Sequence, residues 1–213
     1  MGTMSGQMMK KAVFSAIFVL AVCTKAAAFS PEVELKLDEG TVVYVQQRPE
    51  VPCAGGTAAG CTDSAIYMDP LIPELTADGK LKKLKLSFGF ERLIVEISSK
   101  YPQGTCNYDV VMRHEMRHVA YARGVLKAYA PKLAEALKTK AASLPVPLTQ
   151  EAYNSLTALA DRYFQAMMLK KTQLDDKLDA AGNNAYEWGE CIEAVYRDAS
   201  GRVGTKTFRR GRR

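Results

Sequence analysis

Several residue types and motifs that mark large protein classes are scarce or missing in this 213-residue sequence. It has two histidines, one tryptophan and five cysteines, and it contains neither a P-loop nor a GxGxxG dinucleotide-binding motif. No internal apolar run reaches the ~20 residues that a membrane-spanning helix needs. With 47% apolar and 24% charged residues, however, the composition is that of a folded globular chain and excludes a wholly disordered or collagen-like one.

The first 28 residues have the pattern of an export signal. Lys10 and Lys11 form a positively charged start, residues 12–22 (AVFSAIFVLAV) form an apolar stretch, and Ala28 ends a run of small residues that suits signal peptidase. We therefore predict a signal peptide over residues 1–28 and a periplasmic or secreted protein without stable membrane insertion after cleavage. An uncleaved membrane anchor is the alternative, but the apolar stretch is shorter than a membrane span.

The formal net charge of +6 comes from the two ends of the chain. The predicted signal holds three lysines and no acid, and the stretch from Arg202 to Arg213 holds six basic residues and no acid. The sequence between them is slightly acidic and lacks a basic stripe with interleaved aromatic residues, so we expect no nucleic-acid partner. We predict one domain over residues 29–200 and a basic disordered tail over residues 201–213.

Cysteine usage agrees with export. Four cysteines follow the predicted signal, and an even number in an exported chain favours two disulfides, for which three pairings exist. Cys53 and Cys61 flank the flexible segment AGGTAAG, so we predict a Cys53–Cys61 bond, which leaves Cys106 to pair with Cys191. Free buried thiols are the alternative. A zinc ribbon is disfavoured because the chain has no CxxC pair.

The pattern of apolar residues predicts strands in residues 29–100 and helices in residues 106–200. Strand-like alternation or β-branched runs occur at residues 33–37, 41–46, 84–88 and 93–98, and Asp78-Gly79 predicts a turn before the third of these. Helices are expected at residues 107–130, 131–143, 149–178 and 185–199. In this scheme Asn107 caps the first helix, Pro131 ends it, and Thr149 caps the long one. Strands followed by helices indicate an α+β fold.

The segment His114-Glu115-Met116-Arg117-His118 is an HExxH motif and contains both histidines of the chain. On a helix, residues four apart lie on the same face, so His114 and His118 can bind one Zn²⁺. Glu115 lies beside them and can accept a proton from water that the metal activates. The alternative is a pair of ordinary histidines and a helical glutamate without a metal.

Two stretches around this motif resemble one family. Residues 101–111 (YPQGTCNYDVV) and residues 114–119 (HEMRHV) are similar to the DUF922-like group of exported bacterial proteins, which are described as secreted zinc-dependent proteases. The similarity covers about residues 90–195, and the HExxH stretch is its specific part. The resemblance implies a zincin-like fold, in which an N-terminal mixed or antiparallel sheet packs on the HExxH helix and further helices follow. It also implies metallopeptidase activity, but it names no substrate.

The third metal ligand does not follow from the motif, because the chain has no third histidine. The metzincin extension requires Gly and His at positions that hold Tyr121 and Gly124. A carboxylate, a cysteine or the absence of a third ligand are the options. The carboxylate candidates are Asp175, Asp176, Asp179, Glu187 and Glu190.

The resemblance favours Asp179 among these candidates. The family has a Leu-Asp or Ile-Asp segment followed by a cysteine, which here corresponds to Leu178-Asp179 and Cys191. Glu187 is the second choice because it lies on the last expected helix. A Cys106–Cys191 bond would draw this segment towards the start of the motif helix.

Two functions of different kinds fit the sequence. The first is an exported zinc metallohydrolase, most specifically a metallopeptidase that acts on a peptide or protein, with Zn²⁺ held by His114, His118 and Asp179 and with Glu115 as general base. The second is an exported binding or structural protein on the same scaffold, whose metal is structural or whose site is inactive. A structural site would have a fourth protein ligand, whereas a catalytic site leaves that position open.

Overall fold

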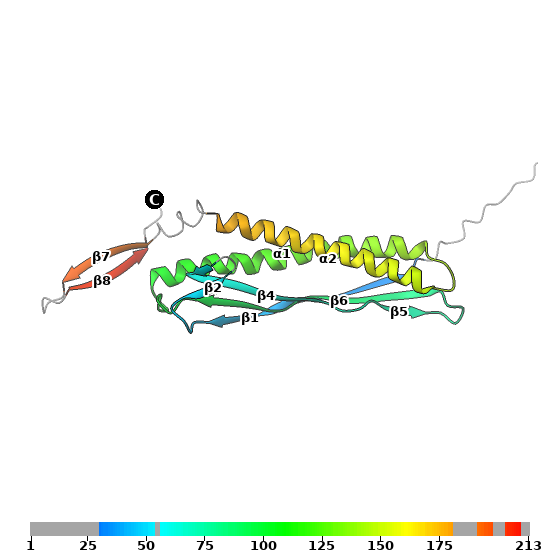
Figure 1. Ribbon diagram of the computed structural model, residues 1–213, viewed down its shortest axis with the longest axis horizontal. Helices are drawn as coiled ribbons and strands as arrows, with labels where there is room; N and C mark the ends of the chain where they lie inside the picture. The colour runs from blue at the N-terminus through cyan, green and yellow to red at the C-terminus, as the bar shows by residue number, and fades with distance from the viewer. Residues whose placement is uncertain (1–29, 54–55, 181–190, 198–202, 210–213) are drawn as a thin grey trace, which may run out of the picture.

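The computed structural model describes residues 30–53, 56–180, 191–197 and 203–209. The predicted signal peptide at residues 1–28 lies outside these ranges, as do the candidate ligands Glu187 and Glu190. The described part is an α+β structure in which two long helices lie over one face of a mixed sheet (Figure 1). No helix in the described ranges is long and apolar enough to cross a membrane.

The sheet is built around one long central strand, β6 (Leu81–Ile97). Strand β1 (Glu32–Val45) pairs with β6 in parallel on one side. Strands β4 (Gly60–Met68) and β5 (Ile72–Leu75) pair with β6 in antiparallel fashion on the other side. A small hairpin of β2 (Val51–Cys53) and β3 (Gly56–Ala58) precedes β4. The sheet is therefore mixed, which is one of the two arrangements that the resemblance implied.

β1 and β6 are each one continuous strand, although the sequence pattern suggested two shorter strands for each. Both strands pass through a glycine at a positive φ angle, Gly40 (φ 74°) in β1 and Gly89 (φ 149°) in β6. A Cβ atom on Gly89 would lie 2.1 Å from the backbone oxygen of Asp38, so only glycine allows the two strands to approach here. These two glycines thus allow β1 and β6 to continue where the sequence pattern suggested a break.

One face of β6 supplies most of the core on the sheet side. Its buried side chains are Leu84, Leu86, Phe88, Phe90, Leu93, Val95 and Ile97. The turn predicted at Asp78-Gly79 is confirmed, because the backbone N–H of Gly79 donates to the oxygen of Thr76 (2.9 Å) just before β6 begins. The apolar face of the sheet is covered by the first helix.

The helices form an antiparallel pair. α1 (Cys106–Ala142) lies against the sheet, and α2 (Gln150–Asp179) packs on α1 (Figure 1). Because a short connection joins them, the beginning of α1 lies beside the end of α2. Arg123 of α1 donates to the backbone oxygens of Glu39 (2.9 Å) and Gly40 (2.7 Å), which fixes the helix against β1.

Two predictions about the first helix were wrong. Its N-cap is Thr105, whose hydroxyl accepts from the backbone N–H of Tyr108, and not Asn107. The helix also continues through Pro131 to Ala142, so the helix expected at residues 131–143 is the second part of α1. A proline inside a helix costs about 3 kcal/mol. That cost is offset by burial of apolar residues on both sides of it, namely Leu126, Ala130, Leu133 and Leu137. The cap at Thr149 of α2 is confirmed.

The C-terminal segment differs most from the prediction. β7 (Cys191–Arg197) and β8 (Val203–Arg209) pair in antiparallel fashion, where the sequence analysis expected a helix and a disordered tail. Both segments are rich in β-branched and aromatic residues, which favour strands once a partner strand is available. A helix was predicted at residues 185–199 from the local pattern alone, which carries no information about the pairing of β7 with β8.

Both predicted disulfides are confirmed. Cys53 and Cys61 have Cα atoms 5.7 Å apart, and Cys106 and Cys191 have Cα atoms 5.9 Å apart. The second bond links the first residue of α1 to the first residue of β7, so it attaches a strand to the motif helix, not a helix to a helix.

Candidate metal centre

The HExxH motif lies in the third and fourth turns of α1, facing the end of α2. Nε2 of His114 and Nε2 of His118 lie 2.9 Å and 3.0 Å from the same atom, Oδ1 of Asp179. The two Nε2 atoms are 3.3 Å apart. Asp179 is the last residue of α2, so the antiparallel helix pair brings together residues that are 65 and 61 positions apart. This group of two imidazoles and one carboxylate could bind a metal ion.

The three side chains differ in exposure. The side chains of His114 and His118 are 12% and 9% exposed, whereas that of Asp179 is 53% exposed. The imidazoles are thus held in the interface between the helices, while the carboxylate lies at its rim. Solvent reaches the group from the side of Asp179.

Asp175, another candidate ligand, contacts the opposite nitrogen of His118. Its Oδ1 lies 2.8 Å from His118 Nδ1. A carboxylate can only accept a hydrogen bond, so Nδ1 carries the proton and donates it. Because Nδ1 and Nε2 point away from each other on the ring, Asp175 does not join the group around the Nε2 atoms. Asp176 is exposed on α2 and is outside that group as well.

Lys171 holds the other oxygen of Asp175. Its Nζ lies 2.7 Å from Asp175 Oδ2, one helical turn away on α2. Burial favours the neutral form of Asp175, but the hydrogen bonds from His118 and Lys171 outweigh burial and lower the pKa of this carboxyl.

The same contacts act on His118. Burial disfavours the charged imidazolium, but the hydrogen bond to Asp175 and the negative charges of Asp179 and Glu115 outweigh burial and raise the pKa of His118. The two aspartates therefore favour the protonated form of His118 more than water would.

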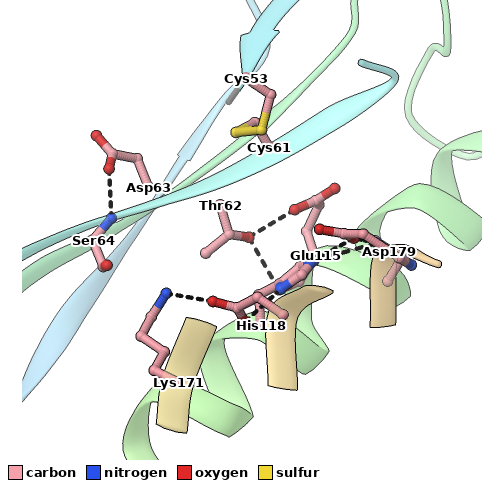
Figure 2. Close-up of a disulfide and its surroundings, with 11 residues drawn as sticks. Cys53, Cys61, Thr62, Asp63, Ser64, Glu115, His118, Lys171 and Asp179 are labelled. Atoms are coloured by element: carbon pink, nitrogen blue, oxygen red, sulfur yellow. Dashed lines mark hydrogen bonds and ion pairs between the residues drawn. A yellow bond between two sulfur atoms is a disulfide. The ribbon is translucent and has the colours of Figure 1, made fainter. Parts of the chain in front are cut away.

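Glu115 is 4% exposed, and its side chain extends from α1 to the start of β4. Thr62 of β4 donates its hydroxyl hydrogen to Glu115, with Oγ1 lying 2.8 Å from Oε2 and 3.1 Å from the backbone oxygen of Glu115 (Figure 2). Burial raises the pKa of the Glu115 carboxyl, although the Thr62 hydrogen bond and the nearby histidines act in the opposite direction. The hydrogen bond from Thr62 fixes the carboxylate of the motif against the sheet.

The backbone next to Thr62 is fitted closely to this glutamate. A Cβ atom on Gly60 would lie 2.9 Å from Glu115 Oε1 and 2.6 Å from Val111 Cγ1, so β4 can approach α1 only because residue 60 is glycine. The disulfide between Cys53 and Cys61 holds the same stretch of β4 (Figure 2). Sequence reasoning missed both Gly60 and Thr62, because each acts across more than 50 residues and neither belongs to a motif.

The structure thus brings together His114, His118 and Asp179, with Glu115 adjacent and Asp175 behind His118. Comparisons with protein-family models, with curated proteins and with solved structures found no match to this chain. The function is therefore inferred from the chemistry of this group of residues.

Proposed function

We propose that this protein is an exported zinc-dependent hydrolase, most specifically a metallopeptidase of zincin-like type. The observation that carries the proposal is the convergence of both motif histidines on Asp179, next to a buried glutamate that is held by the sheet. The two disulfides are compatible with an extracellular location, which is where the proposed signal over residues 1–28 would direct the chain.

The spacing of the three ligand atoms supports zinc. Two ligand atoms that are each ~2.0–2.1 Å from a tetrahedral metal lie about 3.3–3.4 Å apart. The two Nε2 atoms, at 3.3 Å, already have this separation. The Nε2–Oδ1 distances of 2.9 Å and 3.0 Å would need to widen by a few tenths of an ångström. Asp179 can supply this movement because it is half exposed and ends its helix.

The number of ligands supports a catalytic centre over a closed structural one. Within the residues that the structure describes, the group consists of two histidines and one aspartate. A tetrahedral zinc held by three protein ligands keeps one position for water or substrate. Zinc bound in this way would polarise a substrate carbonyl and lower the pKa of a bound water towards ~7.

Glu115 is the residue that moves protons in the proposed reaction. Its carboxylate accepts a proton from the attacking water and later gives it to the departing amine, so that one water and one peptide bond yield a carboxylic acid and an amine. A pKa above the usual carboxyl range suits a group that must both take and give a proton. Thr62 restrains one oxygen of Glu115, and Gly60 lies next to the other.

Elemental analysis of the purified protein beside His118→Ala is the first test. We expect about one zinc per chain in the wild type and a loss of zinc in the variant. Absence of zinc from the wild type after reconstitution would contradict the proposal.

Hydrolysis is then measured by incubating the zinc-loaded protein with a mixed peptide library and identifying cleavage products by mass spectrometry. Glu115→Gln should keep zinc and lose cleavage. Glu135→Gln, the same change at an exposed position of α1, should keep both. Zinc binding without cleavage in the wild type would instead support the non-catalytic binding or structural protein.

A further inference from the structure

We propose that Asp175, supported by Lys171, is a positioning residue that holds His118 in the tautomer whose Nε2 is offered to a metal. The inference rests on the metal binding proposed above and concerns how the site obtains its affinity. Its basis is the pair of contacts His118 Nδ1–Asp175 Oδ1 (2.8 Å) and Lys171 Nζ–Asp175 Oδ2 (2.7 Å).

The first step is the choice of tautomer. A neutral imidazole carries its proton on either Nδ1 or Nε2, and only the nitrogen without the proton can bind a metal. Asp175 can only accept a hydrogen bond, so it retains the proton on Nδ1 of His118. The lone pair is then on Nε2, which is the atom that faces Asp179 and His114.

The second step is the orientation of the ring. His118 is nearly buried, and its two nitrogens contact two aspartates one helical turn apart on α2. Asp175 and Asp179 therefore have different roles at His118. Asp179 joins the ligand group, and Asp175 fixes the imidazole from behind. A carboxylate at this place also makes the imidazole a stronger ligand.

The third step is the role of Lys171. Its side chain is only 12% exposed and lies against Asp175, which is 19% exposed. The lysine occupies the second oxygen of Asp175, so the carboxylate cannot turn away from His118 without losing an ion pair. It also balances one of the negative charges that gather at this end of α2.

The test compares zinc affinity in variants of the full chain, measured by competition with a chromophoric chelator. Asp175→Ala should weaken zinc binding by about 10- to 100-fold, as loss of such a partner does in other zinc sites. Asp175→Asn, which keeps an acceptor for Nδ1, should fall between Asp175→Ala and the wild type. Asp176→Asn is the matched control, because it makes the same charge change at the adjacent exposed position and should bind like the wild type.

A second readout separates positioning from a general effect on folding. The chain has two histidines, so the ¹⁵N–¹H correlation spectrum of labelled, metal-free protein contains two ring patterns. It is recorded with chelator present and at an alkaline pH at which the imidazoles are neutral, because zinc on Nε2 would itself keep the proton on Nδ1. We expect Nδ1 of His118 to be protonated in the wild type and in Asp175→Asn, whereas Asp175→Ala should lose the single tautomer. Lys171→Met should keep the tautomer and lower the affinity less than Asp175→Ala does.

The outcomes distinguish the two proposals. If the wild type binds no zinc, the proposed function fails. If the wild type binds zinc and Asp175→Ala binds it within about twofold of Asp176→Asn, only the role of Asp175 is refuted. An unchanged His118 tautomer in Asp175→Ala would refute it as well.

Discussion

Replacing Thr62 by valine tests whether the sheet holds the glutamate of the HExxH motif. Valine has nearly the same shape as threonine and favours strands, so the change removes a hydroxyl without disturbing β4. The lost hydroxyl is the donor to Oε2 of Glu115, at 2.8 Å. Loss of such a donor to a buried carboxylate lowers the free energy of unfolding by about 1.5–3 kcal/mol when the carboxylate is ionised. The loss is smaller when the carboxyl group is neutral.

The cost should therefore depend on pH. The pKa of Glu115 is raised above its ordinary value of 4.5, so the folded protein binds this proton more tightly than the unfolded chain does. Stability from this group is then highest below pH 4.5 and is lost as the pH rises through the folded pKa. Because the Thr62 hydrogen bond lowers that pKa, Thr62→Val should raise it further and enlarge the loss.

The assay is guanidinium denaturation of the metal-free protein, with chelator present and disulfides intact, at about pH 4 and pH 8. We expect Thr62→Val to be destabilised by about 1.5–3 kcal/mol at the higher pH and by clearly less at the lower pH. Thr62→Ser keeps the hydroxyl and should show the same small effect at both. An equal destabilisation of Thr62→Val at both pH values would refute the assignment of Thr62 as the partner of an ionisable Glu115.

Three further outcomes follow from the same region. Gly60→Ala should destabilise the protein by about 1–3 kcal/mol in denaturation experiments, because its Cβ would press on Val111 and Glu115; wild-type stability would contradict this close fit. Gly124→Ala, at an exposed position of α1 with no neighbour within 4 Å of the new Cβ, should stabilise the protein by about 0.5–1 kcal/mol, and a loss of stability would refute the expectation. Zinc affinity, measured by chelator competition, should fall as the pH drops through the raised pKa of His118, since the proton competes for Nε2; a flat profile would contradict this competition.

The parts of the fold that the sequence predicted are those that depend on local pattern. The alternation along β1 and β6, the cap before α2 and the turn at Asp78-Gly79 are all properties of short segments. The errors arose where a distant partner decides the outcome. Pro131 stays in a helix because α1 is buried along its length, and β7 is a strand because β8 pairs with it.

The same distinction holds at the candidate site. His114, Glu115 and His118 form a local motif, and the disulfide pairings followed from the number and spacing of cysteines. Asp175 and Asp179 could not be told apart by pattern, because residues four apart share one face of a helix. Which of them meets Nε2 and which meets Nδ1 depends on how α2 lies along α1, and this packing is long-range.

The Cys106–Cys191 bond has a consequence for how the proposed metal site is assembled. It closes a covalent ring that contains His114, His118, Asp175 and Asp179. Along the open chain His114 and Asp179 are 65 positions apart, but through the disulfide the route runs over eight residues from Cys106 and twelve to Cys191. This shortcut lowers the entropic cost of bringing the two ligands together by about 1 kcal/mol. Formation of this disulfide would thus make it easier to bring together the residues of the proposed metal site.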